Sequence, residues 1–366
     1  MKVILKFLNL AVFPITLVSV LLLFISGFSP SVSPEYISGI ALLGLAFPYI
    51  WLLNLFLFFY WLVQLRLKAL FPLAALLINF SGIQLYWQWN SDSVKPKNEE
   101  TLNVVSYNAN LFGYYEGEWM VDSVCRMIKN EDPELVLIQE IYNKKGSLER
   151  MRDYLKKNIG LPYGCITKLS NNREYGMCIL SKYPIKNWDK IYLGGATGNM
   201  SMYADISMNK ASFQRTVRIY NIHLQSVRFD KKDYENMEMI MDKPSGNVTT
   251  EGIIAKLKTA YKKRAPQVNS LRKELEKCQF TKIVGGDFND VPMSYTYHQL
   301  SENLNDAFCD RGNGLETTYK GLFPSFRIDY LLSSNSLETL AYKSIKNTPS
   351  DHKMIVSNLN YSPLFE

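Results

Sequence analysis

The chain has 366 residues and a formal net charge of +7 at pH 7, from 41 basic and 34 acidic side chains. The first 90 residues hold four basic residues and one acidic residue, which leaves 37 basic and 33 acidic residues, or a net charge of only +4, in the rest. That charge is too mild to indicate a nucleic-acid groove, which needs clustered Lys and Arg. Five cysteines without metal-ligand spacing argue against a zinc cluster or a complete disulfide framework, and Cys178 lies in an apolar run as a small core residue.

Three apolar stretches occupy the N-terminal quarter of the chain. Phe7–Phe28 and Tyr36–Leu65 are free of charge, and a membrane core needs about 20 helical residues. The third stretch, Ala69–Trp89, is weakened by three polar residues but is closed by Trp87 and Trp89, which suit a membrane interface. The sequence therefore predicts an all-α transmembrane region of three helices.

A cleaved signal peptide is the alternative explanation for the first stretch. Its apolar part exceeds the 7–15 residues typical of such peptides, and no small-residue cleavage site stands out. We therefore predict a transmembrane anchor over residues 1–90, a polar linker (SDSVKPKNEE) over 91–100, and one domain over 101–366 that is long enough for a single large core.

The few charges of the anchor predict its orientation. Lys2 and Lys6 precede the first stretch, and Arg66 and Lys68 lie between the second and the third. The segment between the first two stretches, SPSVSPE, has no Lys or Arg and ends on Glu35. By the positive-inside rule the N-terminus and the second loop face the cytoplasm. Three spans then place the large domain on the outer side of the cytoplasmic membrane, as part of a multi-pass protein.

Polar side chains end several strand-like runs of the large domain. LNVVSYNANLF ends on Asn108 and Asn110, LVLIQEIY carries Glu140, and YNIHLQS carries His223. Each has an ordinary explanation, because Asn caps turns, Glu opens helices, and a His in an alternating run is often half-buried.

Three later motifs add carboxylates and an imidazole beside apolar runs. KIVGGDFND contains Asp287 and Asn289, RIDYLL contains Asp329, and SDHKMIV contains Asp351 and His352. β-Branched residues followed by a Gly pair indicate a strand that emerges at the rim of a sheet. Carboxylates and imidazoles at strand ends can hold a hard cation, orient a water molecule and stabilise charge on phosphorus.

Taken in the order Asn, Glu, His, GDxN, xID and SDH, these motifs resemble the endonuclease/exonuclease/phosphatase superfamily over roughly residues 101–360. That superfamily includes deoxyribonuclease I, AP endonucleases, neutral sphingomyelinases and inositol polyphosphate 5-phosphatases. One motif alone is weak, but the ordinary explanations do not predict six in this order. The resemblance implies an α/β fold, a two-sheet, four-layer α/β sandwich with the motif residues at one rim.

The resemblance also implies a metal site. Asn108, Glu140 and Asp351 match metal ligands. Mg²⁺ is the expected ion, because an all-oxygen site that keeps several waters suits it, and Mn²⁺ is its common substitute. Asn110 and Arg173 are predicted to contact the substrate.

Catalytic roles follow from the same resemblance. Asp287 matches the residue that orients or deprotonates the attacking water, and Asn289 matches the amide that binds the phosphoryl oxygens. His352 resembles an imidazole oriented by a carboxylate, with Asp329 as its expected partner. His223 matches a second imidazole, which donates to the phosphate or the leaving oxygen, and the sequence assigns it no orienting carboxylate.

Departures from two branches of the superfamily narrow the activity. AP endonucleases carry a tyrosine at the position of His223 and an acid at that of Asn110, which disfavours an abasic-site enzyme. Inositol 5-phosphatases show GDxNYR and W-x-D-R, whereas this chain has GDFNDV and SFRIDY, which disfavours phosphoinositide specificity.

An anchor of three spans before an exported domain of this kind resembles the vancomycin/teicoplanin resistance protein J group, which implies lipid-linked pyrophosphate as substrate. A membrane anchor raises the effective concentration of a lipid-borne substrate. We therefore predict a membrane-anchored, divalent-metal-dependent phosphoesterase whose partners are a lipid-linked phosphorylated substrate and the bilayer. The alternatives are an extracytoplasmic nuclease acting on DNA or RNA, a sphingomyelinase-like enzyme or an inositol-phosphate phosphatase. A binding module without activity is disfavoured, because no predicted catalytic position carries an inert residue.

The segment 228–274 carries no motif. Its second half has apolar residues at helical spacing, which we expect to be interrupted near Pro266. Its basic cluster KLKTAYKKR is typical of a solvated helix face, and near a membrane it would contact anionic headgroups or a phosphorylated substrate.

Overall fold

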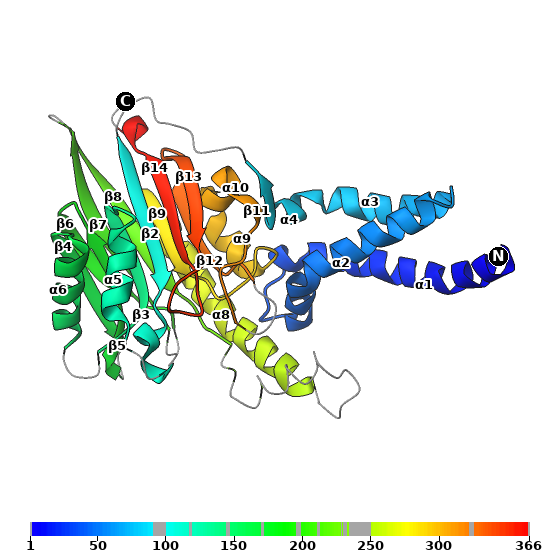
Figure 1. The fold of residues 1–366 in the computed structure, drawn as a ribbon, viewed down its shortest axis with the longest axis horizontal. Helices are drawn as coiled ribbons and strands as arrows, with labels where there is room; N and C mark the ends of the chain where they lie inside the picture. Colours follow the sequence, from blue (N-terminus) through cyan, green and yellow to red (C-terminus); the bar gives the residue numbers. More distant parts are fainter. Residues whose placement is uncertain are drawn as a thin grey trace.

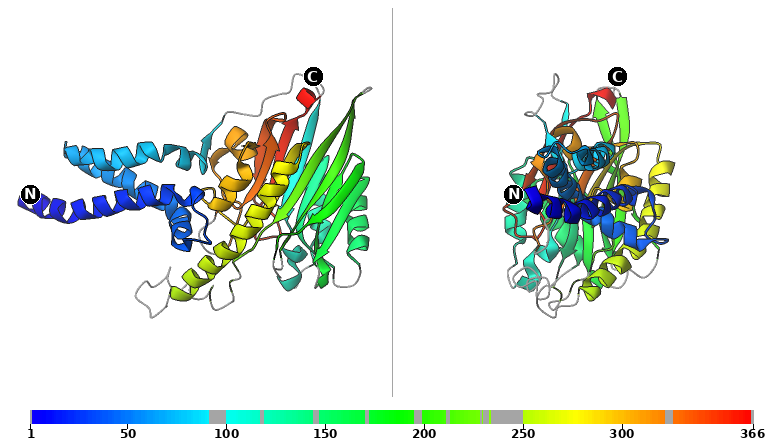
Figure 2. Two further views of the ribbon diagram at one scale, coloured as in Figure 1. Left: turned by 180° about the vertical axis from the view of Figure 1, so that it is seen from behind. Right: turned by 90° about the vertical axis from the view of Figure 1, so that its right-hand side faces the viewer.

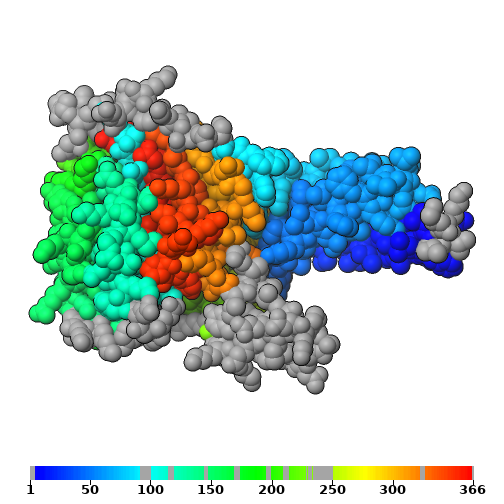
Figure 3. Space-filling view, viewed as in Figure 1, coloured from blue at the N-terminus to red at the C-terminus, as the bar shows by residue number. Residues whose placement is uncertain are grey.

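The computed structural model shows a β-rich body from which a helical arm projects, with the N-terminus at the far end of the arm (Figure 1). The body and arm are also distinct from behind and in the space-filling view (Figure 2, left, and Figure 3). The structure describes residues 2–90, 100–116, 119–143, 147–169, 172–194, 199–210, 213–227, 229, 233, 250–321 and 326–364.

The body contains two stacked six-stranded sheets. The first consists of β2 (Thr101–Asn108), β3 (Leu135–Tyr142), β4 (Tyr163–Leu169), β5 (Asn172–Ser181), β13 (Glu338–Ile345) and β14 (Met354–Asn360). The second consists of β6 (Ile185–Ile191), β7 (Met200–Lys210), β8 (Phe213–His223), β9 (Thr281–Asp287), β10 (Leu304–Asp306) and β12 (Asp329–Ser334). Their strand orders are β13-β14-β2-β3-β5-β4 and β10-β12-β9-β8-β7-β6. Both sheets are mixed, because β2 and β3 run parallel, as do β8 and β9.

Helices cover the outer faces of both sheets. Helices α5 (Val121–Lys129) and α6 (Leu148–Ile159) pack on the first sheet, and α8 (Glu251–Lys277) and α9 (Tyr295–Ser301) pack on the second. Between the sheets lies a third apolar cluster, to which both contribute. The resulting α-β-β-α order confirms the predicted two-sheet, four-layer α/β sandwich.

Burial of both faces of strand β3 explains why its sequence is almost continuously apolar. Leu135 and Leu137 face the second sheet, whereas Val136 and Ile138 face α5 and α6. A strand that is buried on both faces has no solvent side on which to place polar residues.

The arm contains two of the three expected spans. Helices α1 (Lys2–Gly27) and α2 (Ser38–Leu62) are the two helices of the described residues that are long and apolar enough to cross a membrane. The third expected span is wrong, because its stretch is divided into α3 (Leu70–Ile78), α4 (Phe80–Gln84) and β1 (Trp87–Trp89).

Local hydrogen bonding explains the break in the third stretch. Asn79 Nδ2 donates to Ala75 O at 3.0 Å, and such side-chain bonds compete with the helix. The two tryptophans then enter a strand, in which Trp87 is opposite Leu315 of the antiparallel strand β11 (Asn313–Leu315). Helix α10 (Ala307–Arg311) and 3-10 turns at Ser29–Ser31, Leu67–Ala69 and Ser362–Leu364 are further short elements of the described chain. A kinked turn follows β2 at Asn110–Glu116.

The arm has polar contacts inside and apolar side chains outside. Asn54 Nδ2 donates to Ser19 Oγ at 2.8 Å, and Trp61 Nε1 donates to Thr16 Oγ1 at 2.9 Å, all four side chains being buried between α1 and α2. Many large apolar side chains of the same helices are exposed, including Leu5, Phe7, Leu8, Leu10, Ile15, Leu52, Leu53, Phe56 and Phe59.

Direct contacts hold the arm against the body. The backbone N–H of Met293 donates to Tyr86 Oη at 3.3 Å, and Arg327 Nη2 donates to Leu85 O at 3.1 Å. Most of the expected linker, residues 91–99, lies outside the described residues. The arm and the body are therefore packed together by side chains and not joined through a linker alone.

The long helix α8 differs from expectation in two ways. The expected interruption at Pro266 is wrong, because α8 is continuous through it. A proline inside a helix costs about 3 kcal/mol, and the burial of Val268 and Leu271 against the second sheet offsets that cost. Arg264 of the basic cluster is fully buried, with Nη1 2.6 Å from Asp290 Oδ2, so the cluster is not wholly a solvated face.

We expect Gly44→Ala to loosen the contact between arm and body. A Cβ at Gly44 would collide with Met293 O and Ser29 Oγ, and overpacking of this kind costs about 1–3 kcal/mol. Gly39→Ala is the matched control in the same helix, since a Cβ there meets nothing within 4 Å. Thermal unfolding of the detergent-solubilised protein checks this, and equal melting temperatures for the two variants would contradict it.

Candidate active site

Three of the predicted residues lie in one row at the rim of the second sheet. His223 is opposite Asp287 in the parallel pair β8–β9, and Asp329 is opposite Asp287 in the antiparallel pair β12–β9. Neighbouring strands are about 4.8 Å apart, and opposite residues point to the same face. The register of three strands therefore brings one imidazole and two carboxylates together.

The first sheet supplies three further residues to the same rim. Asn108 is the last residue of β2, Glu140 lies near the end of β3, and His352 lies just before β14. Glu140 has a positive φ of 51°, and the pairing of β3 with β5 shifts its register between Ile138 and Ile141. Such a β-bulge re-aims a side chain, and here it lets Glu140 reach the site from a strand that is otherwise buried.

A buried polar contact between the sheets supports the bulge. Gln139 Nε2 donates to Asn221 Oδ1 at 2.7 Å, and Asn221 Nδ2 donates to two backbone carbonyls of the first sheet. Gln139 adjoins Glu140, and Asn221 precedes His223 by two positions. The contact between them therefore positions both Glu140 and His223. Neither residue was predicted from the sequence, although an amide at an interior position of an apolar run is a usable signal.

The Asn108 amide lies between two carboxylates. Its Nδ2 is 3.3 Å from Glu140 Oε1 and 3.1 Å from Asp287 Oδ2, while its Oδ1 accepts from the backbone N–H of Asn110 at 3.0 Å. Carboxylates from the two sheets thus share one donor.

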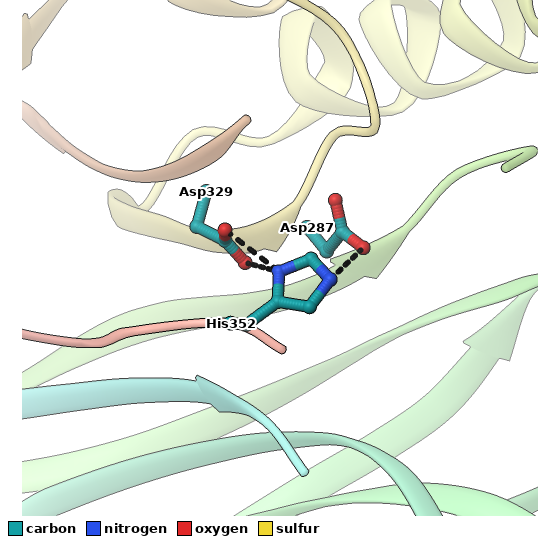
Figure 4. Close-up of side chains that lie close together, drawn as sticks. All are labelled: Asp287, Asp329 and His352. Carbon is teal, nitrogen blue, oxygen red and sulfur yellow. Dashed lines mark hydrogen bonds and ion pairs between the residues drawn. The ribbon is translucent and has the colours of Figure 1, made fainter. Parts of the chain in front are cut away.

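Asp329 and His352, which were expected to be partners, are in contact (Figure 4). His352 Nδ1 lies 2.9 Å from Asp329 Oδ2 and 3.2 Å from Oδ1, and its Nε2 lies 3.8 Å from Asp287 Oδ2. Burial by itself would lower the pKa of His352, but the charges of Asp329 and Asp287 outweigh it and raise the pKa well above its usual value. The two carboxylates therefore favour the protonated form of the imidazole.

Asp287 is buried and surrounded by donors. Its Oδ1 accepts from the backbone N–H of Asn289 at 2.8 Å, and its Oδ2 accepts from Asn289 Nδ2 at 2.9 Å. Burial raises the pKa of Asp287 to about 6. The positive charge of His352 acts to lower this pKa, and the negative charge of Asp329 acts to raise it. A carboxylate with this pKa exchanges its proton close to neutral pH.

His223 has a carboxylate neighbour that the sequence did not assign. Its Nε2 lies 3.2 Å from Glu140 Oε1, and its Nδ1 lies 3.4 Å from the Tyr175 hydroxyl. Burial acts to lower the pKa of His223, but the contact with Glu140 raises it overall. Tyr175 was also missed, and only the pairing of β3 with β5, which sets Tyr175 opposite Tyr142, brings it to the rim.

The remaining predicted residues lie apart from this cluster. Asp351 lines the adjacent cavity, but no hydrogen bond or ion pair joins it to Glu140 or Asn108 in the described part of the chain. Asn110 contacts Asn108 through its backbone, and it is not among the described residues that line the cavity. Arg173 belongs to β5, but its side chain lies outside the described residues.

Glu140 is the carboxylate best placed to hold a cation. Its side chain is 22% exposed, whereas that of Asp287 is 2% exposed. Glu140 Oε1 contacts Asn108 and His223, which leaves Oε2 without a partner among the described residues. Oxygen donors that open to a cavity suit a hard cation such as Mg²⁺ or Mn²⁺.

A second group of ligand atoms lies deeper. Ligand atoms of Asp287, Asp329 and His352 are within 4.8 Å of one another. Both Asp329 oxygens face the His352 ring (Figure 4). This group is therefore arranged as a carboxylate–imidazole–carboxylate chain, in which the protonated ring already supplies the positive charge.

The cluster opens into a cavity of about 510 Å³, a size typical of sites for small molecules. Its polar side contains Glu140, Asp287, Asn289, Asp351 and His352. The described residues that line it include no Lys or Arg.

Comparison with known proteins assigns both parts of the chain to families. Residues 105–213 and 263–352 match the model of the endonuclease/exonuclease/phosphatase family. Residues 6–86 match a domain of unknown function, DUF8431. No curated protein gives a significant match to the sequence.

Three solved structures share the fold. An endonuclease/exonuclease/phosphatase from Bacteroides vulgatus has 16% sequence identity and a TM-score of 0.51, with 71% of this chain and 98% of that chain covered. One from Beutenbergia cavernae has 14% identity and a TM-score of 0.51, with 72% of each chain covered. A functionally unknown conserved protein from Enterococcus faecalis has 14% identity and a TM-score of 0.51, with 70% of this chain and 99% of that chain covered. At these identities the likeness concerns the fold alone.

We expect Asp329→Asn to lower the pKa of His352 by about 1 unit or more, because it removes the nearest negative charge and keeps a hydrogen-bond acceptor. NMR titration of the three labelled histidines in chelator-containing buffer checks this, with the exposed His298 as internal reference. An unchanged His352 titration would show that the pair does not set its protonation.

Proposed function

The chain belongs to the endonuclease/exonuclease/phosphatase family, and on that premise we propose that it is a membrane-anchored, metal-dependent phosphoesterase. Members of this family are hydrolases that act on phosphoester bonds. The proposed substrate is a lipid phosphate or pyrophosphate at the outer face of the cytoplasmic membrane. One observation carries the proposal: the proposed catalytic cluster opens into a cavity that apolar side chains also line, among them Leu45 of helix α2.

Asp287 is the proposed general base. A pKa of about 6 lies close to neutral pH, where a base is both deprotonated and able to accept a proton. The attacking water loses its proton to this carboxylate. The Asn108 and Asn289 amides hold Asp287 in place.

The two imidazoles are the proposed partners of the phosphoryl group. His352, protonated and held by Asp329, donates to the charged phosphoryl oxygens. His223, beside Glu140, protonates the leaving oxygen. Each ring thus has a carboxylate that fixes its orientation.

Glu140 would hold a divalent cation, with Asp351 as the further carboxylate and Asn108 as the amide that orients Glu140. When bound, Mg²⁺ or Mn²⁺ neutralises the charge that builds on the phosphate. The cavity side of the site contains three further carboxylates, those of Asp287, Asp290 and Asp351, and no Lys or Arg among the described residues. An anionic substrate in such surroundings needs a cation beside it.

The arm is the proposed membrane anchor. Helix α1 has 26 residues, which at 1.5 Å per residue is about 39 Å and exceeds a hydrocarbon core of about 30 Å. Its exposed apolar surface and buried polar contacts suit helices that are surrounded by lipid. In the resemblance to the vancomycin/teicoplanin resistance protein J group, such an anchor serves a lipid-borne substrate.

The proposed orientation places the body outside the cell. The N-terminus, with Lys2 and Lys6, lies at the far end of the arm (Figure 1). The turn with Arg66 and Lys68 follows α2 at the end of that helix farther from the body. Positive charge at the far end corresponds to the cytoplasmic side. From this turn the divided third stretch, α3 and α4, returns the chain along α1 and α2 to the body (Figure 1).

Glu140→Gln should abolish most metal-dependent turnover. Loss of the carboxylate charge removes several kcal/mol of stabilisation, so we expect kcat to fall by at least about 10². Glu276→Gln, on the exposed side of α8, is the matched control and should leave kcat unchanged. The measurement is Mg²⁺-dependent hydrolysis of phosphate esters by the full-length protein in nanodiscs.

Full turnover in excess chelator would rule out the metal-dependent assignment. The same assay compares lipid phosphates and pyrophosphates with sphingomyelin, inositol phosphates and plasmid DNA. Faster turnover of plasmid DNA than of any lipid would favour the extracytoplasmic nuclease instead.

Added protease should degrade the body in intact spheroplasts of a bacterial host and leave it intact in inside-out vesicles. The readout is the loss of a C-terminal tag, with a cytoplasmic protein as the control for lysis. Protection of the tag in intact spheroplasts would place the body in the cytoplasm and reverse the proposed orientation.

A further inference from the structure

The cavity beside the catalytic cluster has an apolar wall. This wall is formed by Leu45, Ile253, Ile254 and Leu257, which line the same cavity as Glu140 and the other polar residues. Leu45 belongs to α2 of the arm, and the other three belong to the first turns of α8. Binding and hydrolysis of a phosphate do not require apolar side chains at Leu45 or at these three positions of α8.

Helix α8 carries one apolar stripe with two different surroundings. Val268, Leu271 and Leu275 on its C-terminal half pack against the second sheet. The stripe continues towards the N-terminus through Tyr261 to Leu257, at the spacing of one helix face. There the helix extends past the body towards the arm (Figures 1 and 2). Its apolar face is therefore turned to the cavity, and Ile254 is 38% exposed.

Leu45 is held at the cavity by the contact between arm and body. The preceding residue, Gly44, packs so closely that a Cβ would collide with Met293 O. Met293 follows the loop that contains Asp287 and Asn289 by only a few residues. Helices α2 and α8 are also in contact with each other. A helix suited to cross the membrane thus supplies one side of the catalytic cavity.

We propose that the apolar wall is the subsite for the first carbons of the hydrocarbon chain of a phosphate-bearing lipid, which enters between α2 and α8. The inference rests on the proposed phosphoesterase function and specifies its substrate as a phosphate attached directly to an apolar chain. The phosphate lies against the catalytic cluster, and the remainder of the chain stays in the bilayer beside α2.

The chemistry of the cavity favours this occupant over nucleic acid. Nucleic-acid sites neutralise several phosphates with Lys and Arg, and the described lining contains neither. A single phosphate next to a hydrocarbon chain needs one cation site and one apolar surface. The volume of about 510 Å³ holds a headgroup and a few carbons, but not a complete lipid chain.

The test uses the full-length protein in nanodiscs and a series of n-alkyl phosphates of increasing chain length. We expect kcat/KM of the wild type to rise about fourfold per methylene over the first few carbons and then to level off. In Leu45→Asn and Leu257→Asn this rise should flatten, while kcat/KM for the shortest ester stays within about twofold of the wild type. Ala255→Asn, at an exposed position of the same helix, is the matched control and should keep the wild-type slope.

A binding readout separates this inference from the proposed function. A dodecyl phosphate with a diazirine near the phosphate should label the peptides that contain Leu45 and Leu257, whether or not it is hydrolysed. Labelling at these peptides without hydrolysis of any phosphate ester would refute the phosphoesterase and keep the subsite. Hydrolysis with the same chain-length slope in both variants as in the wild type, or labelling elsewhere, would refute the subsite and keep the enzyme.

Discussion

The site depends on a single constraint: two carboxylates from different sheets, Glu140 and Asp287, share the Asn108 amide. Two buried negative charges this close repel each other and lose hydration, so each needs donors or nearby positive charge. His223 supplies positive charge to Glu140, and His352 supplies it to Asp287. Burial raises the pKa of Asp287 to about 6. Burial acts to lower the pKa values of both imidazoles, but the neighbouring carboxylates outweigh it and raise them.

The same constraint explains why the residues beneath the site are polar. The Gln139–Asn221 contact crosses between the sheets where apolar packing would otherwise continue. A hydrogen bond between two fully buried amides fixes the relative position of the strands, because any slip leaves both amides unsatisfied. Glu140 and His223, which flank this contact, are thereby held in position relative to each other.

The contact between arm and body gives the arm a structural part in the site. Arg327 is buried, pairs with Asp306 and also donates to Leu85 O at the end of the arm. Met293 packs among arm residues, shortly after the loop with Asp287 and Asn289. The arm is therefore packed against the loop that carries the proposed base, and Leu45 of the arm lines the cavity.

The sequence by itself determined two long apolar helices and six motifs beside apolar runs, because burial and periodicity are recorded locally along the chain. The four-layer sandwich followed from the family resemblance that the order of those motifs carries. Only the tertiary structure decided which side chains meet. The Asn108 contacts and the pairing of His223 with Glu140 depend on how two sheets stack, which no local pattern encodes. The unbroken helix at Pro266 was likewise decided by a partner distant in sequence, the second sheet.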